Sequence, residues 1–194
     1  MTAQFNDRCF HRKIDFSIAG ISGSRLFDPA DIGIEPVATS SACWRGYITS
    51  YSIIEGELFL TGLDIGLPDA EAALAKEGRG PELFGVLPVD TKFRGFRYDG
   101  FQSRIPFTGG LLLADDFIPD LYVHMGFHPA WKYKNVREVI FDAGRLTDDH
   151  DRSAEMAELR SRFVEEARQS GRRVSEPTRD QIKEWIEKCF SRSY

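Results

Sequence analysis

The chain has 194 residues and a formal net charge of −5, with 42% hydrophobic and 28% charged residues. This composition is typical of a globular protein and is too apolar for a disordered one. An acidic chain lacks the positive field with which most proteins hold nucleic-acid backbones, so the sequence argues against general nucleic-acid binding.

The sequence shows no targeting signal, no membrane-spanning run and no cysteine motif. Charged residues interrupt every apolar run among the first 30 residues, and no run approaches the ~18 apolar residues that a membrane span needs. Three cysteines without CxxC spacing indicate neither a disulfide framework nor a zinc ribbon. We therefore expect a cytoplasmic protein that contacts no membrane, and the Trp44, Arg45, Gly46, Tyr47 opening of a predicted hairpin favours a bacterial source.

The front of the chain is expected to form strands. Residues 13–18 alternate apolar and polar side chains and predict a first strand, and residues 20–42 read as a long irregular connection. The clearest pattern is at 47–65, where two alternating segments flank Glu55 and Gly56. Because glycine adopts a positive φ without strain, this pattern predicts a β-hairpin.

The middle of the chain predicts further short elements. Alanines in residues 68–78 favour a short helix, and residues 110–114 form the apolar centre of a strand. Residues 122–127 are interpreted as another strand. Residues 136–146 repeat the hairpin pattern with Gly144 in the turn, so we expect a meander.

Two amphipathic helices are predicted at the C-terminal end. A helix over 153–170 would place four apolar residues on one face: Met156, Leu159, Phe163 and Ala167. Residues 178–181 match a capping box and open a second helix. Its apolar face would contain Ile182, Trp185, Ile186, Cys189 and Phe190.

Strands first and helices last indicate an α+β fold. We expect an antiparallel meander sheet, which could also be a partly closed barrel, packed by the two C-terminal amphipathic helices. The chain length fits a single domain over 1–194, mainly β through residue 147 with the short helix near 68–78, and helical over 148–194.

Two histidines four residues apart suggest a metal site. His124 and His128 lie near carboxylates that could complete a ligand set: Asp115, Asp116 and Asp120. On a strand, however, the two histidines would be about 13 Å apart, too far for one ion unless the chain turns between them. His124, His128 and Asp116 are also the candidates for catalysis, and the alternative is two partly buried, hydrogen-bonded histidines.

Aromatic and basic residues suggest where a partner could bind. Residues 92–98 interleave basic and aromatic side chains, which fits either a single-strand nucleic-acid surface or an ordinary half-buried strand. Trp131 and Tyr133 follow a proline and are expected to be partly exposed. Together with Arg94 and Arg97 they are the predicted partner-binding residues, because Trp, Tyr and Arg anchor many protein interfaces.

Three functions remain open on the sequence. The first, which we favour, is a non-catalytic protein that binds a partner protein, such as an inhibitor, an immunity-type protein, an adaptor or a subunit. Its acidic surface would suit a basic partner. The second is a small metal-assisted hydrolase that uses His124, His128 and a nearby Asp, and the third is a β cup that binds a small ligand. No cofactor is predicted, and a homo-oligomer remains possible.

Overall fold

The computed structural model describes residues 2–92, 95–124 and 126–171. Ten strands of this part of the chain form one sheet. The strands are β1 (Arg8–His11), β2 (Ile14–Gly23), β3 (Tyr47–Ile54), β4 (Glu57–Ile65), β5 (Val89–Asp90), β6 (Phe96–Tyr98), β7 (Ser103–Arg104), β8 (Gly109–Phe117), β9 (Tyr133–Asp142) and β10 (Arg145–Asp151). The helices are α1 (Asp69–Lys76) and α2 (Ser153–Gln169), with short 3-10 turns η1 (Pro29–Ile32), η2 (Pro119–Leu121) and η3 (Ala130–Lys132).

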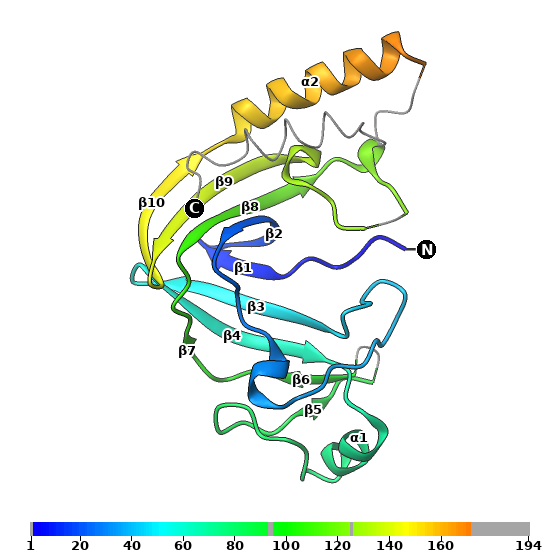
Figure 1. Ribbon diagram of the computed structural model, residues 1–194, viewed down its shortest axis with the longest axis vertical. Helices are drawn as coiled ribbons and strands as arrows, with labels where there is room; N and C mark the ends of the chain where they lie inside the picture. The colour runs from blue at the N-terminus through cyan, green and yellow to red at the C-terminus, as the bar shows by residue number, and fades with distance from the viewer. Residues whose placement is uncertain (1, 93–94, 125, 172–194) are drawn as a thin grey trace.

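The sheet curls into a ring. Its order is β10-β9-β8-β2-β1-β3-β4-β6-β5, and β10 also meets β4 (Figure 1). All described pairs are antiparallel except β1 with β3, so the sheet is mixed. The ring closes through one residue pair, Arg145 opposite Glu57, and it is therefore not a barrel. The α+β class with a largely antiparallel sheet is confirmed, whereas the meander is interrupted because β1 lies between β2 and β3.

Both predicted hairpins are confirmed. The β3–β4 turn has positive φ angles at Glu55 (51°) and Gly56 (79°), as a two-residue loop that follows the twist of its strands requires. The β9–β10 turn repeats this with Ala143 (46°) and Gly144 (84°). A Cβ on Gly144 would lie 2.3 Å from the carbonyl oxygen of Ile105, so glycine is required there by space as well as by φ.

Other local predictions have mixed outcomes. Helix α1 and strand β8 lie where residues 68–78 and 110–114 predicted them. The strand predicted at 122–127 is wrong: among its described residues the chain is irregular, and the positive φ of Gly126 (71°) is incompatible with a regular strand. The helical segment also begins later than residue 148, because 148–151 belong to β10 and pair with β9.

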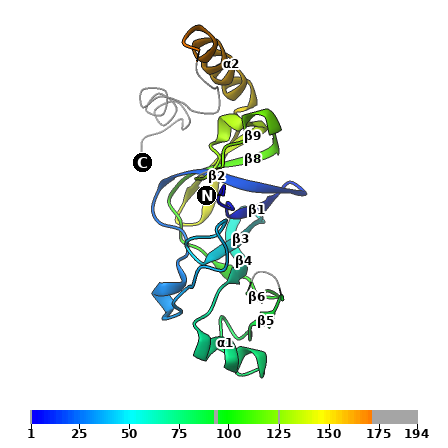
Figure 2. The ribbon, with the colours of Figure 1, turned by 90° about the vertical axis from the view of Figure 1, so that its right-hand side faces the viewer.

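Two apolar cores share strand β8. Alternate side chains of a strand point to opposite faces, and β8 is buried on both. Leu111 and Leu113 belong to the core of the ring, whereas Leu112 and Ala114 belong to the core under α2. Figure 2 shows α1 and α2 at opposite ends of the molecule.

Helix α2 covers the second core with the predicted face. Met156, Leu159, Phe163 and Ala167 are all buried, which confirms that prediction. Each large apolar side chain so buried contributes about 1.5 to 3 kcal/mol before its entropy loss is subtracted. The second predicted helix, with Trp185 and its neighbours, lies outside the described residues. Neither α1 nor α2, the helices of the described part, has the length and apolar character needed to cross a membrane.

Candidate functional site

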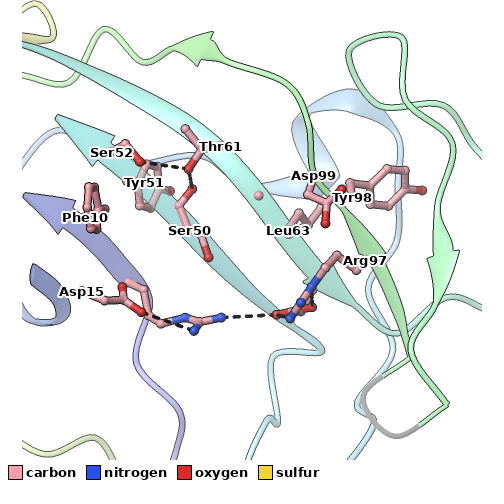
Figure 3. A pocket seen from close by; sticks show the side chains of 13 residues that line it. Phe10, Asp15, Ser50, Tyr51, Ser52, Thr61, Leu63, Arg97, Tyr98 and Asp99 are labelled. Atoms are coloured by element: carbon pink, nitrogen blue, oxygen red, sulfur yellow. Dashed lines mark hydrogen bonds and ion pairs between the residues drawn. The ribbon is translucent and has the colours of Figure 1, made fainter. Parts of the chain in front are cut away.

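A groove of about 470 Å³ crosses the outer face of the sheet. Its floor comes from β3 and β4, one side from β1 and the start of β2, and the other from β6 and the residue after it (Figure 3). Adjacent strand residues face opposite ways, so buried Tyr51 and Leu63 point to the core while their neighbours face the groove. The side chains that shape the groove are Phe10, Asp15, Ser50, Ser52, Thr61, Arg97 and Asp99, with Arg8 and Asp64 at its edge.

The floor is polar and shallow. Thr61 donates a hydrogen bond to the carbonyl oxygen of Ser50 at 3.2 Å, and its Oγ1 lies 3.3 Å from the hydroxyl of Ser52. Gly62 leaves space beside them, since a Cβ there would make only ordinary contacts, 3.5 Å from the Cβ of Ser50. Gly62 is not among the residues with positive φ. A Cβ at Gly62 is therefore accommodated beside Ser50 without straining the backbone, and a side chain built on it would occupy space in the groove.

A buried carboxylate organises the charged edge. Asp64 is 5% exposed and lies opposite Arg97 in the β4–β6 ladder. Arg97 donates from Nε to one oxygen of Asp64 at 2.7 Å and from Nη2 to the other at 3.0 Å. These hydrogen bonds and the charge of Asp64 raise the pKa of Arg97. Nη2 of Arg8 lies 3.7 Å from Asp64, so the Asp64 carboxylate faces the guanidinium groups of both Arg97 and Arg8. Nη1 of Arg8 lies 3.5 Å from Asp15.

The accessible charge of the groove remains acidic. Its residues carry two positive charges, on Arg8 and Arg97, and three negative ones, on Asp15, Asp64 and Asp99. Both arginines face Asp64, and Arg8 also faces Asp15; Asp15 and Asp99 are both exposed to solvent. Phe10 is 49% exposed beside them. The groove thus offers carboxylates, hydroxyls and an aromatic ring to a molecule that enters it.

The predicted partner-binding residues fall in different environments. Arg97 lies in the groove. Arg94 lies outside the described residues. The expectation that Trp131 and Tyr133 are exposed is wrong, because they are 1% and 7% exposed in the core under α2. The rings of Trp131 and Phe163 pack edge to face, with their centres 5.3 Å apart. The two residues are far apart in the chain, so the local sequence pattern could not predict this contact.

The predicted metal ligands do not converge. Asp116 pairs with Lys134 at 3.0 Å, and Asp120 is exposed on η2. Asp115 is half-buried on β8. In the part of the chain that is described, no group of three or more His, Cys, Asp or Glu side chains is arranged to hold a metal ion. The carboxylates therefore give the metal and hydrolase hypotheses no geometric support.

The two histidines differ in burial. His124 is exposed and His128 is buried, and both rings contact Tyr122, with ring centres 4.9 Å and 5.2 Å away. Phe117 contacts His128 at 4.7 Å. Burial, with the nearby charge of Lys132, lowers the pKa of His128 from 6.5 to about 4. His128 is therefore a neutral imidazole at pH 7.

We expect His128 to make stability depend on pH. The unfolded chain protonates this histidine near pH 6.5 and the folded protein only near pH 4, so the free energy of unfolding should fall as the pH drops between those values. The loss should reach roughly 2 to 3 kcal/mol, since one pKa unit corresponds to about 1.4 kcal/mol. Urea unfolding of the wild type and of His128→Phe from pH 7 to 4 measures it. The variant should lose less stability, and parallel curves would show that His128 does not titrate as argued; His124→Phe, at an exposed site, is the control.

Most groove residues were missed by sequence reasoning. Asp64 did carry a signal, because it is a charged residue in the otherwise apolar stretch that ends β4. Arg8 and Phe10 lie on β1, which the sequence analysis did not predict as a strand. The approach of Arg8 to Asp64 depends on the pairing of β1 with β3.

Comparison of the chain with protein-family models, with curated proteins and with solved structures finds no match. Function is therefore inferred from the geometry of the groove.

Proposed function

We propose that this is a non-catalytic, cytoplasmic protein of bacterial type that binds a partner protein in the groove, and that the partner presents a basic segment. The observation that carries the proposal is the charge arrangement: Asp64 pairs with Arg97 and lies near Arg8, Arg8 also pairs with Asp15, and the groove keeps one excess negative charge with Asp15 and Asp99 exposed. A lysine or arginine of the partner would pair with these carboxylates. The net charge of −5 would attract a basic partner from a distance.

The residue types of the groove suit a protein interface. Arginine and aromatic side chains are enriched among the residues that dominate binding energy, and Arg97 and Phe10 supply both. Asp64 holds Arg97 in one orientation before any partner arrives. Preorganisation of this kind reduces the entropy lost on binding.

The groove also lacks the pairing that nucleophilic catalysis uses. Among the described residues, its lining contains no histidine, cysteine or lysine. The hydroxyl of Ser52 lies beside Thr61 rather than beside a base that could activate it. Outside the groove, burial raises the pKa of the Cys9 thiol to about 12, which makes that thiol unreactive.

The proposal predicts which variants abolish partner binding. The tagged full chain captures its partner from cells of its source, and the affinity of the purified pair is then measured by calorimetry. Gly62→Leu should fill the floor and weaken binding by about 10-fold or more. Asp99→Lys should slow association and also weaken binding by about 10-fold, because it reverses an accessible charge that faces the basic segment.

Two matched controls separate the groove from general surface effects. Asp120→Lys makes the same charge change at an exposed residue of η2, and Asn135→Leu introduces the same apolar side chain at an exposed residue of β9. Both controls should retain wild-type affinity. The proposal is wrong if Gly62→Leu and Asp99→Lys bind as tightly as the controls, or if the isolated chain binds no protein and instead turns over a substrate.

A further inference from the structure

Asp149, on β10, gathers three basic side chains from other parts of the sheet. Its side chain is 11% exposed and accepts hydrogen bonds from Nε2 of His11 at 2.9 Å and from Nε of Arg12 at 2.9 Å. Nε of Arg137, on β9, donates to it at 2.7 Å. His11 ends β1, and Arg12 follows in the β1–β2 turn. Since β1 is not a neighbour of β9 or β10 in the sheet, these contacts join two separate parts of the ring.

The carboxylate of Asp149 stays charged in this setting. Burial alone would raise its pKa, but the hydrogen bonds from His11 and Arg137 lower the pKa below its ordinary value. A largely buried carboxylate that keeps its charge depends on its partners, because an unpaired charge is costly away from water. The contact between the β1–β2 hairpin and β10 is therefore in place at neutral pH.

The tip of the β1–β2 hairpin extends beyond its neighbouring strands. β1 pairs with β3 only as far as Phe10, and β2 pairs with β8 only from Ser17 onward. Within the described chain, the residues between these two points pair in the sheet only with one another. Phe16 is buried in the core of the ring and anchors the base of the tip, whereas residues 12–15 are exposed. The contacts with Asp149 tie this tip to the rest of the ring.

The turn of this hairpin has an unfavourable backbone. Its two loop residues, Arg12 and Lys13, both have a positive φ, 50° and 68°. That conformation suits a two-residue hairpin loop, but it is costly for side chains other than glycine, asparagine and aspartate. The β3–β4 and β9–β10 turns each have a glycine at the second loop position, and this turn has none. A tertiary contact such as that of Arg12 with Asp149 offsets this cost.

The same hairpin forms one side of the groove. It supplies Arg8, Phe10 and Asp15, and Figure 3 shows the last two along this side. Alternate residues of a strand face opposite ways, so Phe10 faces the groove while His11 faces Asp149. Phe10 and Asp15 lie opposite each other in the β1–β2 ladder. Asp149 does not line the groove, but it holds the hairpin that does.

We propose that Asp149 is a latch that positions the groove, because it holds the β1–β2 hairpin, and with it Phe10 and Asp15, against β10. This inference rests on the proposed binding of a partner in the groove and adds a residue outside the groove that controls it. Release of the latch would let one side of the groove move while the rest of the sheet stays paired. Because a mobile wall has to be ordered on binding, the partner would then bind more weakly.

Hydrogen–deuterium exchange of the free full chain tests the latch without any partner. Asp149→Asn keeps the shape of the side chain and removes its charge. We expect about 10-fold faster exchange at residues 9–15, with α2 unchanged. Arg12→Ala removes one arm of the latch at an exposed site, and it should speed exchange at the same residues by about 3-fold. This second variant keeps the test available if Asp149→Asn does not fold.

Two controls separate the latch from other effects on exchange. Asp142→Asn makes the same substitution at an exposed residue of β9 and should leave exchange of the hairpin as in the wild type. Leu159→Ala destabilises the core under α2 and should speed exchange at α2 rather than at residues 9–15. Selective loosening of the hairpin by Asp149→Asn would therefore not follow from a general loss of stability.

Affinity for the captured partner then tests whether the latch positions the groove. By calorimetry, Asp149→Asn should weaken binding by about 5-fold to 10-fold, whereas Asp142→Asn should bind as tightly as the wild type. The loss should shrink when Phe10→Ala is also present, because Phe10 lies on the side that the latch holds. It should keep its full size beside Asp99→Lys, on the opposite side of the groove.

The outcomes distinguish a failure of the latch from a failure of partner binding in the groove. Equal exchange at residues 9–15 in Asp149→Asn and Asp142→Asn would overturn the latch, whatever the groove variants do. Faster exchange there with unchanged partner affinity would also overturn the proposal, because the hairpin would be held without positioning the groove. If Gly62→Leu binds as tightly as its control, partner binding in the groove fails, and selective loosening of the hairpin would still support the latch.

Discussion

Trp131→Ala should lower the free energy of unfolding by about 3 to 5 kcal/mol, the range for removing a large aromatic side chain from a packed core. Trp131 is 1% exposed and packs edge-on against Phe163 of α2. The substitution removes the ring that joins η3 to the helix and leaves a cavity between them. Denaturant unfolding followed by circular dichroism gives the value.

Trp44→Ala is the matched control for that experiment. The same ring is removed, but Trp44 is 51% exposed, so the loss should stay below about 1 kcal/mol. A large loss at Trp44 with a small one at Trp131 would instead support the exposure that the local sequence pattern suggested. The assignment of the second core would then be wrong.

Arg152→Ala should also cost about 3 to 5 kcal/mol, because it leaves a buried carboxylate without its main cation. Glu138 is fully buried on β9, and Arg152 donates to its Oε2 from Nε at 3.0 Å and from Nη2 at 2.7 Å. Arg152 immediately precedes α2, so this pair fixes the start of the helix on the sheet. Thermal and denaturant unfolding both measure the loss.

An exposed ion pair provides the comparison. Lys134 and Asp116 are 3.0 Å apart with about half of each side chain exposed, and Lys134→Ala should therefore change stability by less than about 1 kcal/mol. Equal effects of Arg152→Ala and Lys134→Ala would contradict a special role for the buried pair. A double variant in which Glu138→Gln accompanies Arg152→Ala should recover part of the loss, because it removes the buried negative charge that Arg152 no longer offsets.

Local patterns in the sequence predicted the elements whose conformation is set by residues close together in the chain. The face of α2 follows from the spacing of Met156, Leu159 and Phe163, and the β3–β4 turn follows from Gly56. The parallel pairing of β1 with β3 and the contact of β2 with β8 could not be predicted this way. They join segments far apart in the chain, and only the packed ring decides which strands become neighbours.

The candidate sites show the same limit. The sequence singled out His128 by residue type, but its burial depends on Phe117 and on residues 2–6, which no spacing rule brings together. Arg97 was predicted to bind a partner, whereas its orientation depends on Asp64 on another strand. A charged residue within an apolar strand, as at Asp64, is the sequence signal that could have pointed to the groove.

Hydrogen–deuterium exchange on the complex with the captured partner tests partner binding in the groove most directly. We expect slower exchange in the complex at the groove segments, residues 8–15, 50–52, 61–64 and 97–99, with α2 unchanged. Slower exchange at α2 or around His128, with the groove segments exchanging as in the free protein, would contradict it.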